Sequence, residues 1–92
     1  IEIFFDNKLS STYTVLTVIT NDRLGLLYDL SKLLLKSKLM IFTAKISTNG
    51  DFVEDSFHLR TQYGSKFTDE NKIKVLESEI YNMLSQKLEY VY

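Results

Sequence analysis

The chain has 92 residues and a net charge of −1, with 45% hydrophobic and 25% charged side chains. This composition is ordinary for one globular domain, which at this length buries about 60 to 70% of its unfolded surface, and it argues against disorder. Binding to nucleic acid or to an acidic membrane needs a clustered excess of lysine and arginine, which this charge balance does not offer. The absence of cysteine excludes disulfides, thiolate catalysis and cysteine-ligated metal.

The apolar runs and the N-terminus of the sequence indicate where the protein is located and whether the chain is part of a longer one. No apolar run approaches the length that spans a bilayer, and the N-terminus lacks a basic segment followed by a long apolar one. We therefore expect a cytoplasmic protein without membrane contact. The chain begins at Ile1, inside a predicted strand, so we interpret residues 1–92 as one domain excised from a longer multidomain polypeptide.

Two strands are predicted first. Residues 1–5 are mostly apolar and are followed by turn residues, which predicts a short edge strand and a loop to about Ser11. Thr12 to Thr20 is a β-branched run with apolar groups in both alternating sets. That pattern is typical of a strand covered on both faces.

A helix is predicted next, from about Leu24 to Lys36, because leucines recur there at helical spacing opposite Asp29 and Lys32. Asp22 is the expected N-cap. Two strands, 39–48 and 52–61, follow, and the Asn49-Gly50 dipeptide between them predicts a type I′ hairpin turn.

The second helix is predicted from Thr68, its expected N-cap, to near the end of the chain, and Leu88 to Tyr92 are predicted as a short last strand. This order of elements predicts a ferredoxin-like α/β (α+β) sandwich of the βαββαβ type. It consists of an antiparallel sheet with two helices on one face and an extra N-terminal edge strand.

The junction between the second strand and the first helix is the strongest candidate for a binding site. A helix start leaves backbone N–H groups without intrahelical partners and carries the positive end of the helix dipole, which suits a carboxylate. Gly25 has no Cβ, so a ligand can approach its backbone closely. The alternative is that an aspartate cap and a glycine serve folding alone.

No catalytic or metal site is predicted. His58 is the only histidine and has no cysteine with which to form a metal or nucleophilic site. Glu54 and Asp55 are adjacent, so on a strand they point to opposite faces and cannot act as a carboxylate pair. Asp55 shares the face of Val53 and Phe57, where it is either a hydrogen-bonded group at the sheet margin or a contact to the amino group of a ligand.

Aromatic residues on a ferredoxin-like sheet can stack nucleic-acid bases, but the basic aromatic strand motif of that class is absent. The glycines are far apart and match neither a P-loop nor a dinucleotide fingerprint. We therefore expect no nucleic-acid partner and no phosphate cradle.

Three motifs follow one another along the chain: N-D-R-L-G-L-L at Asn21–Leu27, A-K-I-S-T-N-G at Ala44–Gly50 and D-S-F-H-L at Asp55–Leu59. The chain resembles an ACT domain, and most closely the C-terminal ACT repeat of the bifunctional uridylyltransferase/uridylyl-removing enzyme that modifies the nitrogen-regulatory PII protein. That family reads D-R-P-G-L-L, A-K-I-S-T-x-G and D-x-F-x-V. Here Leu24 replaces the proline and Leu59 replaces the valine.

The resemblance implies a regulatory domain that is not itself an enzyme, attached to a nucleotidyltransferase that acts on PII. It implies that a small amino acid, glutamine in this family, is held where the domain meets a second ACT domain in cis or in a homodimer. Carried over residue by residue, the ligand contacts are the loop positions Asn21, Asp22, Arg23, Leu24, Gly25, Leu26 and Leu27 and the strand positions Ile41, Phe42, Thr43 and Ala44.

The alternative is an ACT-type interaction module that pairs domains and has lost its ligand, which the missing proline at Leu24 makes reasonable. The two functions differ in their consequences. A sensor is stabilised by its amino acid, whereas a ligand-free module dimerises with concentration and does not respond to amino acids.

Overall fold

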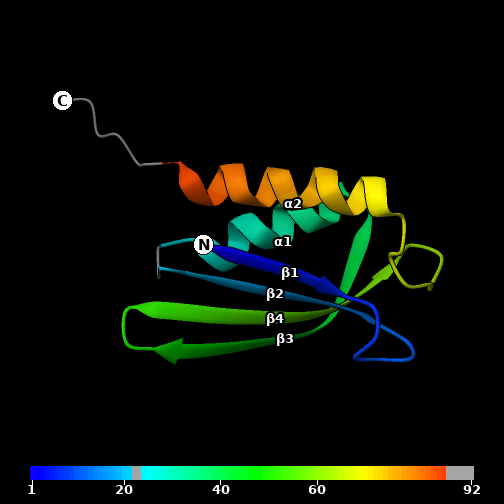
Figure 1. The fold of residues 1–92 in the computed structure, drawn as a ribbon, viewed down its shortest axis with the longest axis horizontal. Coiled ribbons are helices and arrows are strands. Elements are labelled where there is room, and N and C mark those ends of the chain that lie inside the picture. The colour runs from blue at the N-terminus through cyan, green and yellow to red at the C-terminus, as the bar shows by residue number, and fades with distance from the viewer. Residues whose placement is uncertain (22–23, 87–92) are drawn as a thin grey trace.

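The computed structural model describes residues 1–21 and 24–86. Within these residues the elements are β1 (Glu2–Asp6), β2 (Thr14–Asn21), α1 (Leu26–Lys36), β3 (Leu39–Asn49), β4 (Phe52–Thr61) and α2 (Glu70–Ser85). The strands form one antiparallel sheet in the order β1-β2-β4-β3, and both helices lie on the same side of it (Figure 1). This confirms the predicted ferredoxin-like α+β arrangement.

The N-terminal strand β1 pairs with β2 and forms one edge of the sheet, which confirms the extra edge strand. In the ferredoxin-like plan this edge belongs to the strand that follows the second helix. We predicted such a strand at Leu88 to Tyr92, and those residues lie outside the described part of the chain.

Strand β2 begins at Thr14 and not at Thr12, so its predicted start was wrong by two residues. The hydroxyl of Ser10 accepts hydrogen bonds from the backbone N–H groups of Thr12 and Tyr13, at 3.2 and 3.1 Å. This side-chain turn competes with strand pairing for the same donors.

Helix α1 begins at Leu26, two residues later than predicted, because Gly25 at the N-cap position has a left-handed φ of 76°. No side chain of the described residues caps α1. The carbonyl oxygen of Gly25 accepts the first helical hydrogen bond, from the N–H of Asp29 at 2.9 Å. The cap predicted at Asp22 lies outside the described residues.

The β3–β4 hairpin turns at the predicted place, but with different residues at its centre. Asn49 is paired with Phe52, so the two-residue loop is Gly50-Asp51. Gly50 has a φ of 65°, and Asp51 does not have a positive φ. A positive φ at the first central residue alone is the pattern of a type II′ turn, so the predicted type I′ turn at Asn49-Gly50 was wrong.

Helix α2 is capped by Asp69. We had predicted Thr68 as the cap, and that prediction was wrong. The carboxylate of Asp69 accepts hydrogen bonds from the N–H groups of Asn71 and Lys72, at 3.0 and 3.2 Å. Aspartate is at least as good an N-cap as threonine, and its charge also suits the positive end of the helix.

The core lies between the helices and the sheet. Leu16 and Val18 of β2 and Phe57 of β4 pack there against leucines of α1 and against Leu76 and Ile80 of α2. The helices cover one face of β2. On the other face Val15 is 6% exposed and Thr17 and Ile19 are half-buried, and full cover of that face stays a prediction. Neither α1 nor α2, the helices of the described residues, combines the length and the apolar character of a membrane-spanning segment.

Candidate functional site

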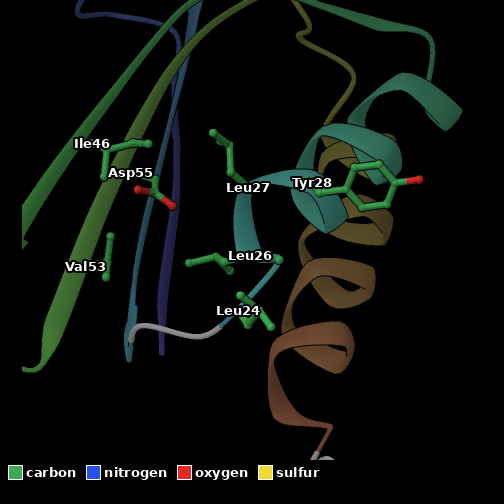
Figure 2. Close-up of a pocket in the computed structure, with 8 residues that line it drawn as sticks. Leu24, Leu26, Leu27, Tyr28, Ile46, Val53 and Asp55 are labelled. Carbon is green, nitrogen blue, oxygen red and sulfur yellow. The ribbon is translucent and has the colours of Figure 1, made fainter.

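A pocket lies at the start of α1, on the helix side of the sheet, with a volume of about 480 Å³ (Figure 2). It is open to solvent and lies between the first turn of α1 and the facing strands β3 and β4. Its lining residues are Leu24, Gly25, Leu26, Leu27, Tyr28, Ile46, Val53 and Asp55.

Four of the loop positions implied by the resemblance therefore meet at one pocket: Leu24, Gly25, Leu26 and Leu27. Asn21 ends β2 and does not line the pocket, and Asp22 and Arg23 lie outside the described residues. The predicted strand contacts Ile41, Phe42, Thr43 and Ala44 do not line this pocket either; Ile46 of the same strand does.

The helix start supplies the pocket with backbone donors. Because α1 begins at Leu26, the N–H groups of its first turn point out of the helix end, and the cap residue Gly25 has no side chain to accept them. Apart from its two chain neighbours, a Cβ built on Gly25 meets no atom of the described residues within 4 Å, so none of them fills the space beside its backbone. A carboxylate fits this position by charge and by hydrogen bonding.

Asp55 places a buried carboxyl group on the opposite wall. The register places it on β4 between Val18 of β2 and Ile46 of β3, so it lies inside the sheet. One of our two interpretations had placed it at the sheet margin, and that position was wrong. Its side chain is 1% exposed and lies on the sheet face that faces α1 (Figure 2). A carboxylate buried to this extent is strongly stabilised by a nearby cation.

Sequence reasoning identified the loop but not the strand side of the pocket. Asp55 and Val53 were assigned to the correct face by their alternation along β4, but nothing in the sequence placed that face opposite Gly25. The irregular register between Ile41 and Thr43 shifts the alternation of β3. That shift puts Ile46 on the pocket side, opposite Asp55.

A metal site and a catalytic site find little support in the described residues. Among the described residues no group of three or more His, Asp or Glu side chains could hold a metal ion. His58 lies on the helix-free face of the sheet, where its ring stacks on Tyr13 with 5.4 Å between centroids.

Comparison with known proteins assigns the chain to a family. Residues 9–87 match the model of the ACR family N-terminal ACT domain. The chain is 39% identical over 87 residues to a bifunctional uridylyltransferase/uridylyl-removing enzyme of Ruegeria pomeroyi, covering 95% of this chain and 10% of that protein. The enzyme of the same name from Azospirillum brasilense is 40% identical over 83 residues, covering 90% and 9%.

The chain thus spans about a tenth of the length of the curated relatives it matches. No solved structure matches it significantly. The family match covers β2, α1, β3, β4 and α2 and includes every residue that lines the pocket, whereas β1 lies before it. The chain therefore belongs to the ACT family of regulatory, ligand-binding domains.

Proposed function

We propose that the pocket at the start of α1 binds a free amino acid. One observation carries the proposal: backbone donors at a helix N-terminus and the buried carboxylate of Asp55 line the same open pocket. An α-amino acid carries a carboxylate and an ammonium group on one carbon, so its two charges match these two walls. The pocket volume falls within the range of small-molecule sites.

Glutamine is the amino acid that we propose, on the resemblance to PII uridylyltransferases. The charged walls of the pocket recognise the part that all amino acids share. The remaining lining is largely apolar and includes Leu27, Ile46 and Val53. Selection among side chains therefore depends on the shape of the closed site.

We further propose that a second ACT domain, in cis or in a homodimer, closes the pocket. Leu24 is 97% exposed at the pocket rim, and Tyr28 and Ile46 are also exposed. Apolar side chains grouped around an open site are typical of a surface that another domain covers. A ligand that binds such a junction favours one arrangement of the two domains over others.

In the parent protein this preference would regulate catalysis. We propose that the chain is the C-terminal ACT repeat of a cytoplasmic, multidomain nucleotidyltransferase that modifies the PII protein, and that glutamine shifts the balance between its uridylylating and deuridylylating activities. The relatives' names and the three sequence motifs support the uridylyltransferase part of this assignment. The C-terminal position rests on the motifs alone, because the matching family model is that of an N-terminal ACT domain.

The second candidate is a ligand-free pairing module. The observation that favours it is Leu24, which stands where the family has proline and projects into solvent beside Gly25. A flexible side chain there can occupy the rim of the site without a ligand.

Thermal unfolding of the 92-residue chain with a panel of amino acids separates the two candidates. A ligand at 100 times its dissociation constant adds about 2.7 kcal/mol to the free energy of unfolding. For a domain of this size that corresponds to a rise in Tm of roughly 10 °C or more. We expect this rise with glutamine; no rise with any amino acid at millimolar concentration would contradict the sensor.

A further inference from the structure

Another pocket, of about 250 Å³, lies at the end of α1, far along the helix from the proposed amino-acid pocket. The end of α1, the β4–α2 connection and the start of α2 meet there (Figure 1). Lysines from all three segments line it: Lys38 follows α1, Lys66 belongs to the connection, and Lys72 lies in the first turn of α2. Segments that are distant in sequence thus bring three lysine side chains to one small cavity.

The lining of this pocket has a positive net charge. Among the described residues that line it, Asp69 is the one carboxylate, so three positive charges and one negative charge leave +2. The carboxylate of Asp69 already accepts two backbone N–H groups as the cap of α2. A phosphate monoester carries a charge of about −1.5 to −2 at pH 7, which balances this lining. A monocarboxylate balances only half of it.

Lys38 has a backbone conformation that favours glycine. Its φ is 61°, and it is the one residue other than glycine with a positive φ in the described part of the chain. The residue after a helix C-cap often adopts this conformation and is then usually glycine, because a Cβ adds a steric cost. The N–H of Lys38 donates to the carbonyl oxygen of Leu35 at 2.9 Å, which fixes its backbone. A lysine side chain is thus held at this pocket where glycine would be the less strained residue.

Lys66 and two hydroxyl groups are also held in place around the pocket. Lys66 is half-buried, and its Nζ donates to the carbonyl oxygen of Asn7 at 2.7 Å, which leaves two N–H groups for a ligand. The hydroxyls of Thr61 and Ser65, which both line the pocket, lie 2.8 Å apart. Only one of them donates in that hydrogen bond, so the other keeps an O–H group for a ligand oxygen. Ammonium and hydroxyl donors suit the oxygens of a phosphate group.

An aromatic ring lies at the rim of the pocket. Tyr63 is one of the lining residues, and its side chain is 85% exposed. The turn that carries it is ordered, because the N–H of Tyr63 donates to the Thr61 hydroxyl at 3.3 Å and the N–H of Gly64 donates to the carbonyl oxygen of Thr61 at 2.9 Å. The exposed ring offers a face on which an organic group attached to the phosphate can pack.

We propose that this pocket binds the phosphate group of a small phosphate monoester. Lys38, Lys66 and Lys72 hold the phosphate oxygens, and Tyr63 packs against the organic part. The spacing of the glycines predicted no phosphate cradle, and this site uses none, because its donors are side chains. It shares no lining residue with the pocket at the start of α1, so the inference goes beyond the proposed function and does not depend on it.

Titration of the ¹⁵N-labelled chain with phenyl phosphate tests the site. Phenyl phosphate carries both a dianionic group and a ring, whereas benzoate has the ring with one negative charge and inorganic phosphate has no ring. We expect the amides of Lys38, Lys66 and Lys72 to shift along one binding curve, and benzoate to bind roughly tenfold more weakly because it loses a charged hydrogen bond. No shifts at millimolar phenyl phosphate, or equally tight binding of benzoate or inorganic phosphate, would overturn the proposal.

Lys38→Gly separates binding from stability. Glycine adopts a positive φ without steric cost, so this variant should not lower the Tm. The loss of one ammonium group should weaken the binding of phenyl phosphate roughly tenfold. Lys38→Arg keeps the charge and should restore most of the affinity. Unchanged affinity in Lys38→Gly would overturn the site.

Lys72→Ala and Lys74→Ala are a matched pair on α2. Both lysines are exposed, but only Lys72 lines the pocket. We expect weaker binding in Lys72→Ala and unchanged binding in Lys74→Ala, and equal losses in the two variants would overturn the site.

A blocked peptide with one phosphoserine presents the same phosphate group on a polypeptide. We expect it to bind no more tightly than phenyl phosphate, and tighter binding of the peptide would overturn the assignment to a small molecule. Glutamine should still raise the Tm of Lys38→Gly, because that variant leaves the pocket at the start of α1 unchanged.

Discussion

Gly25 links the local conformation of the chain to its proposed chemistry. Its φ of 76° is open to glycine at no steric cost, and this conformation starts α1 at Leu26 with no capping side chain from the described residues. The same absence of a side chain leaves the backbone donors of the first turn facing the pocket. One residue thus determines where the helix begins and what its end can bind.

Replacing Gly25 with valine should abolish the rise in Tm produced by glutamine. Valine would put a branched side chain in the open space beside the backbone donors and would cost about 1 to 2 kcal/mol of stability at a positive φ. The control is Gly64→Val, because Gly64 has a similar φ of 79°, has open space around it and lies outside the pocket. Both variants should lose stability, but a glutamine response that survives in Gly25→Val would show that the ligand binds elsewhere.

Asp55→Asn should weaken glutamine binding by roughly tenfold to a hundredfold, since a charged hydrogen bond contributes about 1.5 to 3 kcal/mol. Isothermal titration calorimetry of the folded variant measures this directly. Glu54→Gln makes the same chemical change on the adjacent residue, whose side chain lies on the opposite face of β4, and should leave the affinity unchanged. Equal affinities for Asp55→Asn and the unmodified chain would remove Asp55 from the site.

Asp6 should make folding stability depend on pH. Its carboxylate accepts hydrogen bonds from the backbone N–H groups of Lys8 and Leu9, which lower the pKa of Asp6 below its usual value. Because the folded pKa is the lower one, the stabilisation is present above the unfolded pKa, near 4, and is lost as the pH falls through the folded pKa. In urea unfolding, Asp6→Asn should be less stable than the unmodified chain at pH 7, and the difference should shrink in acid; a constant difference would contradict this.

At the scale of elements, the order and type of the strands and helices in the described residues could be predicted, because periodicity and turn residues are local signals. The ends were less predictable, because they depend on competition between neighbouring donors and acceptors. The Ser10 hydroxyl accepts hydrogen bonds from two backbone N–H groups, so β2 begins later than predicted. Asp69 caps α2 in place of Thr68. The hairpin turn lies one residue later in the chain than predicted, because β3 pairs with β4 as far as Asn49.

The cap of α2 can be tested by a matched pair of variants. Asp69→Ala removes the acceptor of two backbone hydrogen bonds and should cost about 1 kcal/mol, or roughly 4 to 8 °C in Tm. Thr68→Ala changes the adjacent residue, which caps nothing, and should shift the Tm by much less. Equal losses for the two variants would mean that the cap does not stabilise α2 as the hydrogen bonds indicate.

The candidate site was only half predictable for a similar reason. The loop side, from Leu24 to Leu27, is contiguous in sequence and carries the family motif. The strand side joins Ile46, Val53 and Asp55 across two strands, and their meeting depends on the β3–β4 register and its irregularity near Phe42. Register is a tertiary property that alternation along one strand does not determine.

At the scale of the whole molecule, the helix side of the sheet holds the pocket, whereas the helix-free side carries the cluster in which Arg60 lies over the rings of Tyr13 and Phe42. In Figure 1 the start of α1 lies near the edge of the layered structure, where a second domain can reach it. An effector bound there can change how domains pair only if it binds one arrangement more tightly than another.

Titration of the ¹⁵N-labelled chain with glutamine, followed by backbone amide chemical shifts, tests the central claim most directly. If the helix start receives the ligand carboxylate, the amides of Leu26, Leu27 and Tyr28 should shift most, together with that of Asp55, and should saturate along one binding curve. Shifts confined to other parts of the fold, or none at millimolar glutamine, would contradict an amino-acid site at the start of α1.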